Sequence, residues 1–177
     1  MKKLLFSALL LSTVAISAQE TESQSSERQN DIMISPIELI GGAALNFSYE
    51  RLLNKDSGVG INGLFGFKDN DNNAFSQISP YYRMYFGKKY GGGFFVEGFV
   101  PITSTKDGGY NYYNGGGYTQ KNPETNTTVG AGIGFGGKWV ARKNIIFELS
   151  SGIARRFGSG NFDKITGKGM LGIGYRF

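Results

Sequence analysis

Apolar and polar residues alternate along most of the chain from position 31 onwards. Segments of roughly ten residues carry an apolar or aromatic residue at every second position, and clusters of Gly, Asn, Asp and Lys separate them. Successive side chains of a β-strand point to opposite faces of the sheet, so this period of two predicts strands with one apolar face and one polar or small face. About eight such strands can be counted.

The expected strands share this alternation and cover, approximately, residues 32–40, 43–52, 58–67, 75–86, 93–103, 127–140, 145–155 and 167–177. The first is the least regular of them, because Pro36 has no N–H to donate to a neighbouring strand. Gly41 and Gly42 follow it at once and allow only a tight connection to the second strand. The proline and the two glycines therefore interrupt the alternating pattern at this first strand.

Short and long connections alternate along the chain. Brief turns are expected near residues 55, 88 and 143, whereas longer polar connections are expected near residues 72, 115 and 160. The longest connection covers about 104–126. Outer-membrane barrels pair short periplasmic turns with longer extracellular loops in this way. Only the first connection, at Gly41, departs from the rule.

The N-terminal residues have the layout of a secretory signal peptide. Lys2 and Lys3 precede an apolar run over about 4–16, and Ser17 and Ala18 follow it, which predicts a signal peptide over residues 1–18. The apolar run is shorter than the roughly 20 residues of a membrane-spanning helix. Residues 19–30 are mostly Glu, Ser, Gln and Thr and are expected to form a disordered periplasmic leader. Residues 31–177 then form one barrel domain.

The alternation alone does not decide which face of the sheet points outwards. Small and charged residues collect on one face, and aromatic residues near strand ends lie on the other, such as Tyr49, Phe86, Trp139 and Tyr175. Outward aromatic residues of this kind suit the girdles at membrane interfaces. The sequence therefore predicts an all-β fold, a closed antiparallel transmembrane β-barrel in the bacterial outer membrane, in contact with its lipid and lipopolysaccharide. The alternative is a soluble, lipocalin-like binding barrel, secreted or periplasmic, with the apolar face inside.

The expected inner face carries three acidic and three basic residues on different strands, namely Glu50, Arg83, Glu97, Lys138, Glu148 and Arg176. An eight-stranded barrel has room only for side chains, and buried charges are costly unless they are paired. We therefore expect an ion-pair network in a filled lumen, where the glycines of residues 130–136 make room for Tyr81, Tyr85 and Phe95. The alternative is a narrow channel for protons or small solutes.

The chain contains neither histidine nor cysteine. It therefore lacks the commonest general base, the commonest metal ligand and the usual nucleophile pairs, and we expect no enzyme, no cofactor and no metal. Asp69 and Asp71 could hold calcium weakly, but their segment lacks the glycine and glutamate of a calcium-binding loop. The formal charge of +5 falls by two without the signal-peptide lysines, and no nucleic-acid partner is expected.

The longest expected connection is rich in tyrosine. Tyrosines on a polar frame of Gly and Asn make good contacts with glycans and proteins. The candidate binding residues are Tyr110, Tyr112, Tyr113 and Tyr118. The alternative is a mobile, solvated loop without a dedicated ligand.

Four segments carry a resemblance to a known family: Ser48–Arg51, Pro80–Phe86, Val129–Gly132 and Gly174–Phe177. Together with the signal peptide, they resemble small outer-membrane β-barrel proteins of the OmpA and OmpX type. The resemblance implies an eight-stranded barrel that is inserted by the barrel-assembly machinery, which in such families reads the last strand and its terminal aromatic residue. In this chain those assembly residues would be Tyr175 and Phe177. The resemblance implies no catalytic or ligand residues. The first hypothesis for function is therefore a non-enzymatic barrel with a structural or surface-interaction role through its loops.

Overall fold

The computed structural model describes residues 28–41, 44–67, 75–107, 110–113, 118–121, 124–158 and 163–177. The proposed signal peptide, most of the leader and the segment with Asp69 and Asp71 lie outside these ranges. The main sheet consists of β1 (Asn30–Ile34), β2 (Ala44–Asn54), β3 (Ser57–Gly66), β4 (Phe75–Tyr85), β5 (Gly93–Phe99), β6 (Ile102–Asp107), β9 (Glu124–Val140), β10 (Ile145–Phe157) and β11 (Ile165–Arg176).

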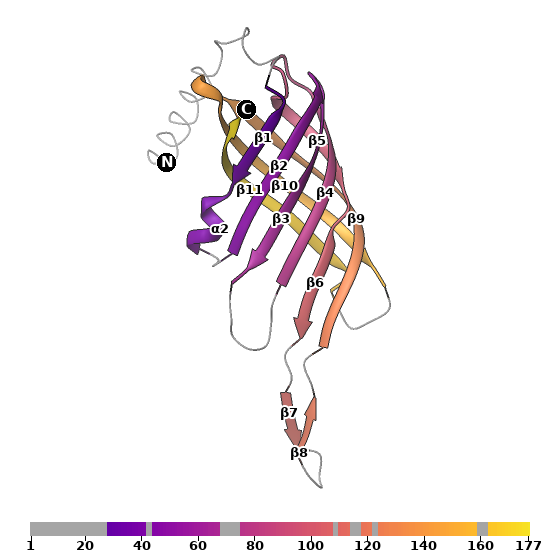
Figure 1. Cartoon of the computed structure of the whole chain (residues 1–177). Coiled ribbons are helices and arrows are strands. Elements are labelled where there is room, and N and C mark those ends of the chain that lie inside the picture. The colour runs from indigo at the N-terminus through magenta and orange to yellow at the C-terminus, as the bar shows by residue number, and fades with distance from the viewer. Residues whose placement is uncertain are drawn as a thin grey trace, which may run out of the picture.

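This sheet closes into a barrel (Figure 1). Every strand runs antiparallel to its neighbours, and β10 pairs with both β11 and β9, so the sheet has no free edge. The strands β5 and β6 occupy one position between β4 and β9, interrupted at Val100 and Pro101. The barrel thus has eight strand positions, as predicted from the sequence.

The first and last strands close the barrel. Asp31 lies opposite Arg176 in the β1–β11 pair. The Asn30 N–H donates to the Phe177 carbonyl at 3.0 Å, and the Phe177 N–H donates to the Asn30 carbonyl at 2.8 Å. The prediction that the leader extends to residue 30 is therefore wrong at its end, because Asn30 is already part of the sheet and Gln29 accepts a hydrogen bond from Leu52.

The prediction of a strand over residues 32–40 is also wrong beyond Ile34, where β1 ends. The chain leaves the sheet there and forms the short helix α2 (Pro36–Gly41). Proline suits the first position of a helix, and Ser35 with Glu38 gives the Ser-x-x-Glu spacing typical of a helix start. The Ser35 hydroxyl donates to a carboxylate oxygen of Glu38, and the Asn46 side-chain amide donates to the other oxygen at 3.0 Å. Among the described residues, no helix has the length and apolar character needed to cross a membrane.

Short and long connections lie at opposite ends of the barrel. The turns after β2, β4 and β9 lie at the end where β1 begins and β11 finishes (Figure 1). The helix α2 and the C-terminal ends of β3, β6 and β10 lie at the other end. The expected tight connection at Gly41 is therefore wrong, and the first connection, which contains α2, follows the rule for outer-membrane barrels.

The expected loop over residues 104–126 is mostly a β-hairpin. The strands β6 and β9 pair from Ile102 and Val129 out to Asp107 and Glu124. Beyond them, β7 (Tyr110–Tyr113) pairs with β8 (Tyr118–Lys121) as a separate two-stranded sheet. The hairpin extends far from the barrel body at the end with the long connections (Figure 1).

The two faces of the barrel wall differ in polarity. The exposed fractions of Phe47, Ile133 and Ile173 on the outside are 37, 71 and 42%, whereas Arg83 and Glu97 inside are 1 and 2% exposed. Interior apolar contacts are limited to small groups, such as Leu52 with Tyr85 and Phe95. A soluble lipocalin-like barrel requires the reverse arrangement, so the structure does not fit that alternative.

Candidate functional site

The predicted lumen charges lie on six different strands and converge on the barrel axis. Each is 0–2% exposed, and the set consists of Glu50 (β2), Arg83 (β4), Glu97 (β5), Lys138 (β9), Glu148 (β10) and Arg176 (β11). The period of two places each side chain inside, because its neighbours in sequence point outwards. The structure therefore brings together the residues that the sequence places on the inner face.

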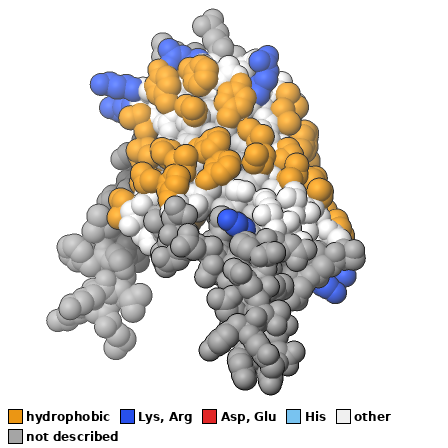
Figure 2. All heavy atoms as spheres, turned by 60° about the horizontal axis from the view of Figure 1, so that its bottom comes forward, with side chains coloured by type: hydrophobic (Ala, Val, Ile, Leu, Met, Phe, Trp, Pro, Cys, Tyr) orange, Lys and Arg blue, Asp and Glu red, His pale blue; other side chains and the backbone are white. Residues whose placement is uncertain are grey.

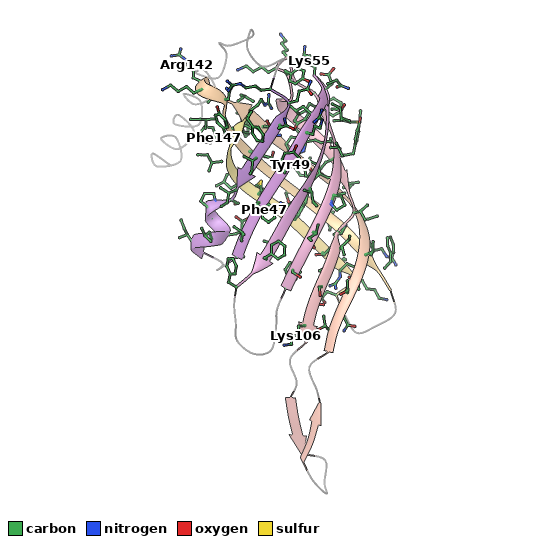
Figure 3. The ribbon with its side chains drawn as sticks, viewed as in Figure 1. Phe47, Tyr49, Lys55, Lys106, Arg142 and Phe147 are labelled. Carbon is green, nitrogen blue, oxygen red and sulfur yellow. The ribbon has the colours of Figure 1, made fainter. Side chains whose placement is uncertain are left out.

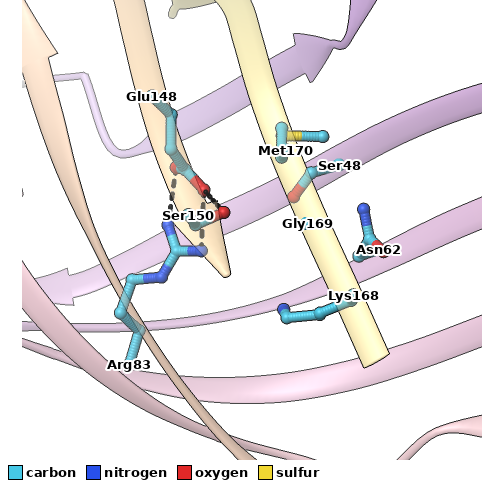
Figure 4. A pocket seen from close by; sticks show the side chains of 8 residues that line it. All are labelled: Ser48, Asn62, Arg83, Glu148, Ser150, Lys168, Gly169 and Met170. Carbon is cyan, nitrogen blue, oxygen red and sulfur yellow. Dashed lines mark hydrogen bonds and ion pairs between the residues drawn. The ribbon is translucent and has the colours of Figure 1, made fainter. Parts of the chain in front are cut away.

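Arg83 is the centre of this charged cluster. Its guanidinium lies 2.9 Å from Glu50, 2.8 Å from Glu97 and 2.8 Å from Glu148. Two of its nitrogens bind the two oxygens of Glu148, as Figure 4 shows. The guanidinium carbon also lies 3.7 Å from the centre of the Phe95 ring. Only the planar, five-donor arginine side chain can serve three carboxylates and stack on a ring at once.

Lys138 and Arg176 extend the cluster towards the end with the short turns. The Lys138 ammonium lies 2.6 Å from Glu50 and 3.0 Å from Asp31. Arg176 binds both oxygens of Asp31, at 2.7 and 2.9 Å. It also donates to the carbonyls of Tyr90 and Gly91 at 2.7 and 2.9 Å. The last strand is thereby tied across the lumen to the turn between β4 and β5.

Two members of the cluster were not among the residues predicted from the sequence. Lys168 lies 2.7 Å from Glu97, and Asp31 joins Lys138 to Arg176. Lys168 shares the even-numbered face of β11 with Arg176, so the period of two could have identified it. Asp31 was left outside the expected first strand, which begins two residues earlier than expected. With them, four acids and four bases form one continuous set of ion pairs.

Aromatic rings and glycines fill the space around the charges. A Cβ atom built on Gly136 would lie 2.6 Å from the Phe95 ring, and one on Gly60 would lie 2.5 Å from the Tyr81 ring. Gly136 therefore makes room for Phe95 as expected, whereas Tyr81 packs against Gly60 on β3, which lies outside the predicted run of glycines. The hydroxyls of Tyr81 and Tyr85 donate to Glu50 at 3.2 and 2.5 Å.

The lumen continues as a polar layer towards the end with the long connections. Gln77 accepts hydrogen bonds from Thr103 and Thr166 at 3.0 and 2.9 Å, and Arg156 donates to Thr128 at 2.7 Å. A cavity between this layer and Arg83 measures about 10 Å³ and is lined by Ser48, Asn62, Arg83, Glu148, Ser150, Lys168, Gly169 and Met170 (Figure 4). That volume holds about one water molecule. The described residues include no group of acidic side chains arranged to hold a metal ion.

The outer wall forms an apolar belt. Hydrophobic side chains cover the barrel face seen in Figure 2, with Lys and Arg at its rim. Phe47, Tyr49 and Phe147 lie between Lys55 and Arg142 at the end with the short turns and Lys106 at the other end (Figure 3). The expected girdle residues Tyr49, Phe86, Trp139 and Tyr175 are 38–62% exposed on this belt. The wall therefore has an apolar exterior and a charged interior. This is the arrangement of outer-membrane barrels and the reverse of that in soluble proteins.

The chain has the fold of a small outer-membrane β-barrel. No family model matches the sequence, and no curated protein matches it. Two solved structures are similar to it. The N-terminal β-barrel domain of Pseudomonas aeruginosa OprF is 16% identical, with a TM-score of 0.49, and the match covers 85% of this chain and 99% of that one. The Yersinia pestis outer membrane protein Ail is 19% identical, with a TM-score of 0.42 and the same coverage.

The remaining candidate residues lie at the two ends of the barrel. Tyr110, Tyr112 and Tyr113 fall in β7 and Tyr118 falls in β8, where Tyr113 pairs with Tyr118; their side chains lie outside the described part of the structure. Tyr175 and Phe177 point outwards at the opposite end, where they are 45 and 51% exposed. The two sets therefore belong to different sides of the barrel.

Proposed function

We propose that this protein is a non-enzymatic, integral outer-membrane barrel whose lumen is closed and whose long-loop end makes structural or surface contacts. The main support for this proposal is the buried set of eight charged side chains, which the apolar outer wall encloses. Each carboxylate in the set lies within 3.0 Å of a cation, so the lumen is filled by paired side chains. An interior of this kind holds the barrel together and leaves no room for a substrate.

The arrangement of the connections supports an orientation. Short turns belong to the periplasmic side in outer-membrane barrels, and long connections belong to the outside. The β7–β8 hairpin with its four tyrosines then projects from the cell, where it can contact glycans or proteins. The belt contacts lipid and lipopolysaccharide, and the barrel-assembly machinery recognises the last strand during insertion.

Reconstitution tests this proposal. The protein should be found in the outer-membrane fraction, and its folded form should migrate differently from the heated form on a gel. In planar bilayers the closed lumen predicts no steady openings. Steady openings that vanish when Glu97 or Arg83 is replaced would instead support a narrow channel for small solutes. A mature protein that stays in the soluble fraction without detergent would contradict membrane insertion altogether.

Deleting Phe177 should impair assembly while leaving synthesis and export intact. The deletion removes the two backbone hydrogen bonds between Phe177 and Asn30 that close the barrel, together with an outward aromatic ring. The measurement is the fraction of heat-modifiable protein in the outer membrane. Phe177→Tyr keeps the ring and the backbone, and serves as the control with near-normal assembly. Full insertion of the deletion variant would show that Phe177 has no role in assembly.

A further inference from the structure

The outer face of β9 has a gap in its row of large side chains. Phe135 and Trp139 point outwards, but the outward position between them is Gly137. Gly137 lies opposite Phe94 on β5 and Leu149 on β10. These four large side chains surround a hollow of about 480 Å³. The indole of Trp139 leans over Gly137, since a Cβ atom there would lie 2.8 Å from the ring.

A second hollow adjoins the first at the periplasmic rim. It measures about 180 Å³ and shares Gly93 and Trp139 with the first hollow. Lys88 and Lys89, from the turn between β4 and β5, line this second hollow. No acidic residue is among the described residues that line either hollow. Together the two hollows form one groove, which we call the β9 groove. It is apolar where it crosses the belt and basic at the rim, where Lys88 and Lys89 lie.

The length of the β9 groove matches one leaflet of a membrane. It follows β9 from Phe135 to Val140, five residue steps, which correspond to about 17 Å of strand, or about 13 Å of depth at a tilt of about 40°. Half of the hydrocarbon core of a bilayer is about 15 Å thick. A single acyl chain can therefore lie along the groove while its headgroup reaches the rim.

We propose that the β9 groove binds a phospholipid with an anionic headgroup in the periplasmic leaflet. One acyl chain lies against the Trp139 indole that covers Gly137, between Phe94, Phe135 and Leu149, and the phosphate contacts Lys88 and Lys89. Lysine ammonium groups bind phosphate as point charges, and a tryptophan at the interface suits the junction of chain and headgroup. This inference rests on the proposed membrane location, because the groove opens onto the lipid-facing wall.

Trp139 provides the readout, because it is the single tryptophan of the chain. The folded barrel is reconstituted into phosphatidylcholine vesicles. One sample contains a small fraction of brominated phosphatidylglycerol, and the other contains the same fraction of brominated phosphatidylcholine. Bromine quenches the indole fluorescence of Trp139 only when the brominated chain is close to it. We expect brominated phosphatidylglycerol to associate about fivefold more strongly than brominated phosphatidylcholine at the same mole fraction.

Two variants locate the preference. Lys88→Gln with Lys89→Gln should reduce the ratio of the two association constants to about one. Lys55→Gln with Lys106→Gln removes two lysines that line neither hollow, and should keep the wild-type ratio. Equal quenching by the two lipids in the wild-type protein would overturn the inference, as would a preference that survives in the Lys88 and Lys89 variant. Absence of quenching by both lipids would overturn the membrane location itself, and the inference with it.

Discussion

Replacing Arg83 with methionine is expected to lower the free energy of unfolding by roughly 3–5 kcal/mol. The substitution keeps much of the side-chain volume but removes the cation that binds Glu50, Glu97 and Glu148. Those carboxylates are almost completely buried, so they would repel one another without a solvent to screen them. Urea titration of the reconstituted barrel, followed by the gel mobility of the folded form, measures the change.

Two further variants separate the loss of charge from the loss of packing. Arg83→Lys keeps a cation but has no planar fork to bind Glu148 with two nitrogens, so it should lose less stability than Arg83→Met. Combining Arg83→Met with Glu148→Gln should recover part of the loss. Without Arg83 the cation nearest to Glu148 is Lys138 at 3.8 Å, whereas Glu97 keeps Lys168 at 2.7 Å and Glu50 keeps Lys138 at 2.6 Å. An unchanged urea midpoint for Arg83→Met would show that the ion pairs do not hold the barrel together.

The second large effect is expected from Gly132→Val on the inner face of β9. A Cβ atom at Gly132 would lie 2.5 Å from the Ala154 Cβ, 2.6 Å from the Phe99 ring and 2.7 Å from the Ile153 carbonyl oxygen. The carbonyl belongs to a paired strand and cannot move aside without disturbing the ladder. Overpacking of this kind costs about 1–3 kcal/mol, and more where the backbone must shift.

Ala131→Val is the matched control for Gly132→Val. It adds a branched side chain one residue earlier on the same strand, where the side chain is exposed on the outer belt. Its stability should stay close to that of the wild type in the same urea titration. Equal losses in the two variants would show that β9 is sensitive to any branched residue, and that the inward glycines are not needed for packing.

The strands and their two faces could be predicted from the sequence because the period of two is a rigid property of strand geometry. Runs such as Val129–Trp139 keep the alternation over their whole length, so the inward position of Lys138 follows from that of its neighbours. The pairing of individual charges could not be predicted. It depends on the stagger between strands across the lumen, which no single strand specifies.

The extended hairpin and α2 were missed for two different physical reasons. The outer parts of β6 and β9, including Thr103–Thr105 and Thr125–Thr128, are polar on both faces because they lie beyond the apolar belt. Hydrophobicity therefore does not alternate in these segments, and the period of two cannot identify them as strands. For α2, the apolar residues Ile37, Leu39 and Ile40 suggested a continuing strand, although Ser35, Pro36 and Glu38 carry the signal for a helix start.

The tie between Arg176 and the turn after β4 links chain segments 85 and 86 residues apart. Contacts over such separations form late, because the loop between them must close first. The end of the barrel with the short turns thus stays open until β11 is paired and Arg176 reaches this turn. A chain without Arg176 would leave the Tyr90 and Gly91 carbonyls without this donor, so closure of that end depends on β11 being in place.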